Sequence, residues 1–352
     1  MQVLGIDAGG SKTVALLADG EGRVLAEGRA GGANLQAHGE LEVEKVLHAV
    51  IDQAAPDRGA VDAVCLGLAG VDREGDLSII RGIMRRLGFR EHALIVNDAL
   101  IALVAGAGQA AGLVLVAGTG SIAYGVSGRG IAARAGGWGS ALGDEGSGYW
   151  IGRRALTAVT RAADGRGPAT ALSRLVLAHF SLARPEQLVT EIYDHARGRQ
   201  SIATLGEVVE RARADGDAVA TEILRDAAAE LALAASSVVS RLGMRGDQFP
   251  TLLSGGLLKG TEWLVAEVTR HMAEVAPRSQ VARLAVEPAM GAVRLAIAEA
   301  AGGARVPPYL DAFAGEGKPS AGGGKPSAGE GQPSAGEGQP SAGGGKPSGL
   351  PS

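Results

Sequence analysis

The chain has 352 residues and a formal net charge of −4 at pH 7, a length that leaves room for two domains. It has no basic block, which argues against a nucleic-acid surface, and no apolar run long enough to span a membrane. Its single cysteine, Cys65, excludes an intrachain disulfide and a cysteine-rich metal site. Residues 1–10 lack the basic and apolar regions of a signal peptide, so we expect a cytoplasmic α/β protein.

The chain opens with two short apolar runs around a polar, glycine-containing turn, a pattern that predicts a β-hairpin. Glycine lets the backbone approach a ligand closely, and successive N–H groups in such a turn can converge on phosphate oxygens. A phosphate-binding turn is one interpretation, and an ordinary hairpin with a polar tip is the other. The polar and glycine residues of this turn are Asp7, Gly9, Gly10, Ser11, Lys12 and Thr13.

The pattern then changes from antiparallel strands to strand–helix crossovers, which predicts a mixed sheet with helices on its faces. In such sheets ligands gather at the carboxyl ends of the strands, where Asp98 lies just before a helix. A helix cap is the alternative role for Asp98, and Asn34 either contacts a ligand or only braces its loop. The elements expected here are a strand at 23–27, a helix at 40–55, a strand at 62–69, a helix at 77–87, a strand at 92–96 and a helix at 99–107.

A second strand–turn–strand pattern follows, with strands expected at 113–117 and 122–126 around Gly118-Thr119-Gly120-Ser121. It repeats the theme of the opening hairpin, because glycines and hydroxyls again separate two apolar runs. Two such hairpins, each opening a new block of sequence, suggest a duplicated scaffold. Its two turns would hold a polyphosphate from opposite sides.

The segment 134–149 is dense in glycine, which neither a core strand nor a helix tolerates well, so we expect a loop. Trp138 supplies a flat apolar face, and Asp144 and Glu145 supply hydrogen-bond acceptors. A flat ring beside carboxylates suits a sugar, whose C–H face stacks and whose hydroxyls donate. An ordered structural loop is the alternative.

The second half of the chain carries a helical insert and ends in a repeat. Gly255 and Gly256 follow a strand at 248–253 and either pass close to a nucleobase or ribose or form an ordinary turn. From Ala314 a seven-residue Gly/Pro/Ser repeat begins, which cannot bury enough apolar surface to order itself. The other elements expected are helices at 149–163, 170–180, 185–196, 201–215, 217–242 and 257–275, an edge strand at 282–286 and a last helix ending near Ala301.

Seven motifs occur in order: GIDAGGSKT, the loop with Asn34, GLAGVD, NDA, AGTGS, GGWGSALGDEGSGYWIG and LLSGGLL. Together they resemble the sugar kinase–Hsp70–actin superfamily and, within it, the family of N-acetylglucosamine kinases and BadF/BadG/BcrA/BcrD ATPases. The resemblance covers residues 1–302. It implies two actin-like, ribonuclease H-like α/β domains with mixed sheets flanked by helices and an ATP cleft between them. The implied domains are 1–109 plus 289–302, then 110–288 with the helical insert, followed by a disordered tail at 303–352.

The resemblance implies an ATP- and Mg²⁺-dependent kinase acting on the 6-hydroxyl of an amino sugar, N-acetylglucosamine first among them, with Asp98 as the general base. Asp7 would orient Mg²⁺, through water. The implied ATP site comprises Gly9, Gly10, Ser11, Lys12, Thr13, Gly118, Thr119, Gly120, Ala212, Gly255 and Gly256. The implied sugar site comprises Asn34, Asp98, Ser121, Ile122, Gly137, Trp138, Gly139 and Asp144.

Other functions remain open at this point. Glucosamine and N-acetylmuramic acid kinases share most of these motifs, and an ATP-binding sensor or regulator without phosphotransfer is an alternative of another class. Dehydratase activators of the family carry a cysteine-ligated iron–sulfur cluster, and the single Cys65 argues against that role. We expect a small-molecule sugar and ATP as partners, no nucleic acid and no membrane, and the family makes a homodimer plausible.

Overall fold

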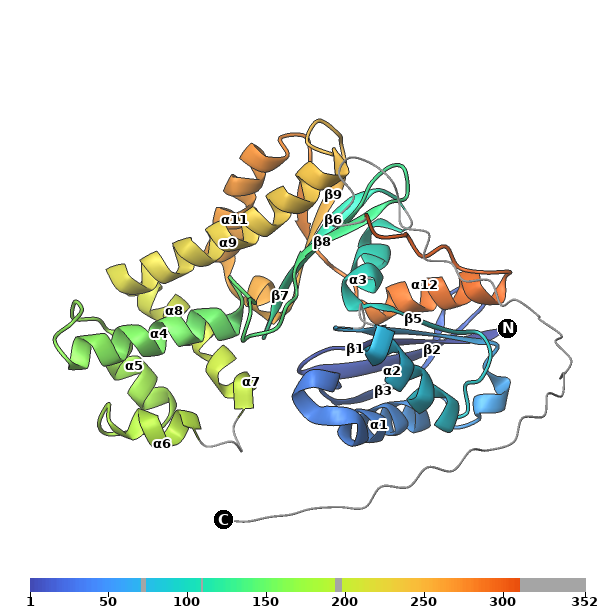
Figure 1. The fold of residues 1–352 in the computed structure, drawn as a ribbon, viewed down its shortest axis with the longest axis horizontal. Coiled ribbons are helices and arrows are strands. Elements are labelled where there is room, and N and C mark those ends of the chain that lie inside the picture. Colours follow the sequence, from blue (N-terminus) through green and yellow to red (C-terminus); the bar gives the residue numbers. More distant parts are fainter. Residues whose placement is uncertain (71–73, 109, 194–197, 311–352) are drawn as a thin grey trace, which may run out of the picture. The chain divides into compact units, whose positions relative to one another are not determined.

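Two five-stranded mixed sheets form the framework of the protein (Figure 1). The computed structural model describes residues 1–70, 74–108, 110–193 and 198–310. Asp72 of the GLAGVD motif and the Gly/Pro/Ser repeat from Ala314 onward lie outside the described residues. No helix in the described part of the chain is both long and apolar enough to cross a membrane.

The first sheet has the strand order β3-β2-β1-β4-β5. Its first two strands form the predicted hairpin, with Asp7 opposite Val14 and Ala8 opposite Thr13, and β4 and β5 then add in parallel. Alternating aliphatic side chains bury both faces of β1, which is why this apolar run forms a central strand. The strands are β1 (Gln2–Ala8), β2 (Lys12–Asp19), β3 (Val24–Gly31), β4 (Ala63–Leu68) and β5 (Ala93–Asn97).

Two helices and one short 3₁₀ turn join these strands, and a third helix follows β5. The first helix starts earlier than expected, because the Asn34 side chain accepts a hydrogen bond from the backbone N–H of Ala37 and caps it. A kink at Gly39 (φ 76°) separates that first turn from the regular amphipathic stretch that the periodicity predicts. The elements are α1 (Leu35–Ala54), η1 (Arg58–Ala60), α2 (Glu74–Arg86) and α3 (Asp98–Ala107).

The second sheet has the order β10-β9-β6-β7-β8. One strand was not predicted: β8 includes Arg134–Gly136, which we had assigned to the glycine-rich loop. These residues form a strand because they pair antiparallel with β7, a contact that local composition does not reveal. The edge strand expected at 282–286 lies slightly earlier. The strands are β6 (Gly112–Ala117), β7 (Ser121–Val126), β8 (Ala132–Gly136), β9 (Pro250–Ser254) and β10 (Gln280–Arg283).

The helical insert lies between β8 and β9, as expected, and its helices pack around an apolar cluster that continues onto the second sheet (Figure 1). The helix expected at 201–215 is in fact two helices, with Thr204 between them. The insert contains α4 (Gly148–Ala163), α5 (Leu172–His179), α6 (Gln187–Tyr193), α7 (Gly198–Ala203), α8 (Leu205–Ala214) and α9 (Ala218–Leu242). After it come α10 (Gly256–Gly260), α11 (Glu262–Val275) and α12 (Ala289–Ala300).

Helix α12 follows the second sheet in sequence but packs on the first sheet, against β1 and α3 (Figure 1). A Cβ atom on Gly291 would lie 1.8 Å from the carbonyl oxygen of Ile101 in α3. A Cβ atom on Gly5 of β1 would lie 2.4 Å from the backbone nitrogen of Val293. The backbones therefore touch at both crossings, and only glycine fits there.

The predicted fold class is confirmed: two mixed sheets are flanked by helices. The division into two domains after residue 109 stays a prediction, because residues 1–310 belong to one compact unit. Residues 303–310 correct the expected start of the tail. Pro308 and Leu310 hydrogen-bond with the backbone of Ala132 (2.9 and 2.8 Å), and the Tyr309 ring meets that of Tyr124 edge-to-face at 6.0 Å. Tyr309 thereby gives this segment an aromatic contact with the second sheet.

Candidate active site

A cavity of about 830 Å³ opens at the carboxyl ends of five strands, β1, β4, β5, β6 and β9. Both sheets contribute to its walls, with Asp7 from β1 and Ser254 from β9 among the lining residues. This is the position at which α/β sheets place their ligands. The site expected from the sequence is therefore a single space rather than a set of separate loops.

The turn of the first hairpin is closed by the backbone N–H of Gly9, which donates to the carbonyl of Lys12 at 3.0 Å. This leaves Ser11 and Lys12 on the cavity wall. Thr13 does not reach the cavity, contrary to our prediction. It is fully buried in β2, and its hydroxyl donates to the carbonyl of Gly31 at 2.8 Å, because the strand has already begun and turns this side chain away.

The turn of the second hairpin meets the first one. Its own closing bond runs from the Gly118 N–H to the Gly120 carbonyl at 2.9 Å, and Thr119 lies at its tip. The Thr119 Oγ1 is 2.8 Å from the Ser11 Oγ. Both hydroxyls also lie against the side-chain oxygen of Gln200 in α7, at 2.7 Å for Ser11 and 2.6 Å for Thr119. The two hydroxyls expected to hold phosphates thus contact each other and the same Gln200 oxygen in the cavity.

Two carboxylates of the first half face the same cavity. Asp7 is buried, and burial together with the negative charge of Asp98 raises its pKa to about 7, with Lys12 opposing the shift. Asp98 is half-buried in the first turn of α3. The N-cap of that helix is Asn97, whose side chain accepts from the Ala99 N–H at 2.9 Å. Capping is therefore not the role of Asp98.

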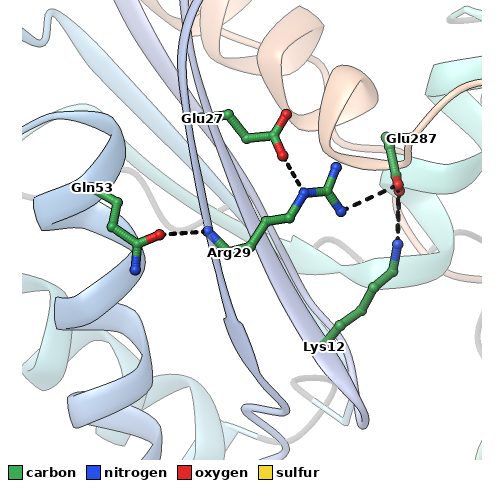
Figure 2. A network of polar contacts seen from close by, with 5 residues as sticks. All are labelled: Lys12, Glu27, Arg29, Gln53 and Glu287. Carbon is green, nitrogen blue, oxygen red and sulfur yellow. Dashed lines mark hydrogen bonds and ion pairs between the residues drawn. The ribbon is translucent and has the colours of Figure 1, made fainter.

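Lys12 is held from outside the turn by Glu287, which immediately precedes Pro288 and α12 (Figure 2). The Lys12 ammonium is 2.9 Å from the Glu287 Oε2 and 3.1 Å from its Oε1. Arg29, itself bonded to Glu27, lies 3.7 Å from the same carboxylate. Burial would raise the pKa of Glu287, but Lys12 with Lys259 and Arg29 holds it below its usual value. This network ties the turn of the first hairpin to the crossover that leads into α12.

The glycine-rich loop brings a buried carboxylate to the cavity. Asp144 has a φ of 61°, is 6% exposed, and accepts from the Ser121 N–H at 3.3 Å. Burial raises its pKa, partly opposed by that hydrogen bond and by Arg199. Glu145, expected as a second acceptor, is exposed, and its backbone carbonyl instead receives the Ser121 hydroxyl at 2.6 Å.

Trp138 belongs to the same glycine-rich loop. It lines the cavity, and 58% of its surface is exposed. The Arg134 guanidinium lies 4.9 Å from the centre of its ring, within cation–π range. A large, mostly exposed indole next to a polar cavity is available for stacking on a ligand. Its place in a sugar site stays a prediction.

Two predicted residues do not line the cavity: Thr13, described above, and Ala212, which is fully buried in the apolar cluster of the helical insert. Ala212 faces the core because its position on α8 belongs to the stripe that packs on α9. Asn34 caps α1 and so braces its loop, and it also lines the cavity; contact with a ligand stays a prediction. The predicted residues that do line it are Asp7, Gly9, Gly10, Ser11, Lys12, Asn34, Asp98, Gly118, Thr119, Gly120, Ser121, Ile122, Gly137, Trp138, Gly139, Asp144, Gly255 and Gly256.

The sequence analysis missed several lining residues: Asn97, Ser140 and Ser254 lie within the quoted motifs but were not singled out, and the others stand outside them. Lys259 had a usable signal, since it directly follows LLSGGLL. Arg199 and Gln200 had none, since they lie in the helical insert and reach the cavity only through the fold. The missed polar lining residues are Gln36, His38, Asn97, Ser140, Arg199, Gln200, Ser254 and Lys259.

The donor set fits a magnesium ion that arrives with a nucleotide. Within the described ranges, no group of three or more His, Cys, Asp or Glu side chains could hold a metal by itself. Mg²⁺, however, is usually bound through one or two carboxylates together with substrate phosphates. Asp7, with Asp98 close enough to raise its pKa, supplies that kind of partial site in the cavity.

Comparison with known proteins agrees with this geometry. The chain matches the BadF/BadG/BcrA/BcrD ATPase family over residues 4–296. The protein belongs to this family. It is 36% identical over 301 residues to the N-acetylmuramic acid/N-acetylglucosamine kinase of Clostridium acetobutylicum, covering 84% of this chain and 98% of that one. It is 33% identical over 310 residues to the N-acetyl-D-glucosamine kinase of Dictyostelium discoideum, covering 84% and 97%.

Solved structures show the same architecture in other members of the superfamily. A structure from Chromobacterium violaceum, named as a candidate N-acetylglucosamine kinase, superposes with a TM-score of 0.67 at 26% identity, covering 84% of this chain and 98% of that one. The ROK glucokinase of Streptomyces griseus, solved with glucose and AMPPNP, shares the fold at a TM-score of 0.56 and 18% identity, with coverage of 84% and 97%.

Proposed function

We propose that this protein is an ATP-dependent kinase that phosphorylates the 6-hydroxyl of N-acetylglucosamine. The observation that carries the proposal is the single cavity that contains the paired hydroxyls of Ser11 and Thr119 and the carboxylate Asp98. Hydroxyls at a glycine turn suit phosphate, and a carboxylate suits a sugar hydroxyl. The names of the two relatives that are at least 33% identical support the same chemistry.

In this proposal the two hairpin turns bind the phosphate chain of ATP. Backbone N–H groups of the glycine turns and the two hydroxyls donate to phosphate oxygens, while Lys12 and Lys259 add positive charge at the wall. Bound Mg²⁺ would be held by Asp7 together with the phosphates and would neutralise charge on the transferred group. Phosphoryl transfer needs mainly positioning and charge neutralisation, which are what these residues provide.

Asp98 is proposed to bind the 6-hydroxyl and to accept its proton late in the transfer. Asp98 follows the carboxyl end of β5 and lines the cavity. It does not cap α3, because Asn97 is the N-cap of that helix. General-base assistance contributes about 10²–10⁴-fold to a rate. The same carboxylate fixes the orientation of the attacking hydroxyl, which is the larger part of its task in a loose transition state.

The glycine-rich loop is proposed to recognise the sugar. Trp138 offers its ring to the C–H face, and buried Asp144 offers an acceptor to a ring hydroxyl. Asn34 and Ser121 line the same part of the cavity, and the backbone of Gly137 and Gly139 allows close approach. The clustering of these groups favours a sugar substrate over a bare ATPase.

N-acetylmuramic acid is the second candidate substrate, because the relative from Clostridium acetobutylicum is named for both amino sugars. Glucosamine is the third. An ATP-binding regulator that transfers nothing is the alternative of another class, and the conjunction of Asp98 with the Trp138 loop argues against it. A cytoplasmic location and a homodimer stay predictions, which cell fractionation and analytical ultracentrifugation would test.

The test is ADP release with ATP and Mg²⁺ in the presence of N-acetylglucosamine, N-acetylmuramic acid, glucosamine or glucose. We expect strong release with N-acetylglucosamine and a 6-phosphate product identified by mass spectrometry. ADP release with glucosamine alone would identify glucosamine, rather than N-acetylglucosamine, as the substrate. ATP binding without release for any sugar would favour the regulator.

A further inference from the structure

A side chain of the helical insert occupies the meeting point of the two phosphate turns. Gln200 lies in α7, far in sequence from both hairpins, yet its side-chain oxygen accepts from Ser11 at 2.7 Å and from Thr119 at 2.6 Å. The preceding residue, Arg199, donates to the Ser140 hydroxyl of the glycine-rich loop at 3.2 Å. Helix α7 is thus fixed to the cavity wall at two neighbouring positions.

The three oxygen atoms form a cluster that is short of protons. The Ser11 and Thr119 hydroxyls lie 2.8 Å apart, so three close oxygen pairs share the two protons that these hydroxyls carry. One of the three contacts therefore lacks a proton at any moment. A charged acceptor would draw both hydroxyl protons to itself, because hydrogen bonds to ionised groups are stronger than those between neutral groups.

A phosphate oxygen is such an acceptor, and the amide oxygen of Gln200 stands where it would bind. We infer that Gln200 imitates a phosphate oxygen when no nucleotide is bound and sets the nucleotide affinity by competing with ATP for Ser11 and Thr119. The inference rests on the proposed function, because it assumes that the nucleotide phosphates bind between the two hairpins. Gln200 is then a residue that determines affinity rather than one that binds the nucleotide.

Substitutions at Gln200 give opposite predictions for this competition. Gln200→Ala removes the competing oxygen, so the Kd for ATP should fall, on the order of tenfold for a lost neutral hydrogen-bonded contact. Gln200→Glu places a charged acceptor against both hydroxyls and repels the phosphates, so the Kd should rise by about tenfold or more. Both values are measured by isothermal titration of the full chain with Mg²⁺ and ATP and without sugar.

Two controls separate competition from a general effect on the fold. Adenosine, which has no phosphates, should bind all variants equally. Gln53→Ala should leave the Kd for ATP unchanged. The Gln53 side-chain oxygen accepts from the backbone N–H of Arg29 at 2.9 Å, and it lies on the opposite side of β3 from the ion pairs of the Arg29 side chain (Figure 2). The substitution also removes a glutamine oxygen, so it matches the chemistry of Gln200→Ala.

A Kd for ATP that is unchanged or higher in Gln200→Ala would overturn the inference, as would an equal change for adenosine. Absence of ATP binding in the unaltered protein would also overturn it. The kinase proposal fails differently: ATP would bind with the predicted shifts, but no sugar would release ADP. The two failures are therefore distinguishable.

Discussion

The two sheets of this protein have the same plan and different contents. In each, three antiparallel strands are followed by two parallel ones, so β1–β5 correspond in order to β6–β10. The hairpins β1–β2 and β6–β7 both end in glycine turns that carry a hydroxyl, Ser11 in one and Thr119 in the other. The expected duplicated scaffold is thus visible in the strand order.

The difference lies in what each half adds to the plan. Asp7 is the penultimate residue of β1, and the matching position of β6 is Val116. The first half links its third and fourth strands with the single helix α1, apart from a 3₁₀ turn, whereas the second half inserts α4 to α9 at that place. The comparison teaches that the two halves place their cavity charges differently: the first half carries Asp7 and Asp98 at the ends of its strands, whereas the second half brings Asp144, Arg199 and Lys259 from a loop and from helices.

Replacing Asp98 tests whether the first half alone carries the proton chemistry. Asp98→Asn should lower kcat for N-acetylglucosamine by about 10²–10⁴-fold, because it removes the proposed general base. Titration calorimetry should show ATP binding retained. The control is Asp247→Asn, an exposed carboxylate of the second half, which should behave like the unaltered protein. A kcat within twofold of the unaltered protein for Asp98→Asn would remove Asp98 from the mechanism.

Asp7→Asn tests the same asymmetry through stability. The folded protein holds the pKa of Asp7 at about 7 against an ordinary value of 3.8, so it keeps a proton that the unfolded chain releases. This stabilisation is present at low pH and is lost as pH rises towards 7. Between pH 5 and pH 8 the unaltered, nucleotide-free protein should lose about 2–3 kcal/mol relative to Asp7→Asn.

Urea unfolding of both proteins at the two pH values measures that difference. A matched substitution in the other half, Val116→Ala, should shift stability by the same amount at pH 5 and pH 8, because no ionisable group stands there. Parallel pH profiles for Asp7→Asn and the unaltered protein would show that Asp7 titrates normally.

The two hairpin hydroxyls should be equivalent if the duplication extends to function. Ser11→Ala and Thr119→Val should each weaken ATP binding by roughly tenfold, the value of one lost hydrogen bond to a charged group. Thr269→Val, on the exposed surface of α11, is the control. Isothermal titration measures all three, and an effect confined to one hairpin would break the symmetry.

Two truncations test which of the C-terminal residues contribute to the stability of the second half. Removal of everything after Leu310 should leave kcat and unfolding unchanged. Removal after Gly302 also deletes Tyr309, whose ring meets Tyr124 and whose neighbours bond to Ala132, so it should cost about 1–2 kcal/mol. Thermal unfolding of the two proteins gives the difference. Equal melting temperatures would restore the tail boundary to 303.

The sequence predicted features that depend on neighbours along the chain. The apolar runs predicted the central strands, and the glycines with hydroxyls predicted both hairpin turns. It did not predict β8, which forms through pairing with β7, or Gln200 and Glu287, which reach Ser11 and Lys12 across 189 and 275 positions. Thr13 and Ala212 do not line the cavity: the motif that contains Thr13 does not say which way its side chain points, and Ala212 lies in no motif. Contacts of that range depend on the fold and leave no local pattern.

The crossing of α3 and α12 at Gly291 has a consequence for how the two copies could diverge. The second copy carries a large insert and still has the same strand order as the first, so that connection tolerates added length. At Gly291 even one methyl group would overlap the Ile101 carbonyl, 1.8 Å from its place. In a library of all substitutions, this position should accept nothing but glycine, while the loops of the insert accept most changes. The crossing of α3 and α12 should therefore tolerate substitution less well than the loops of the insert.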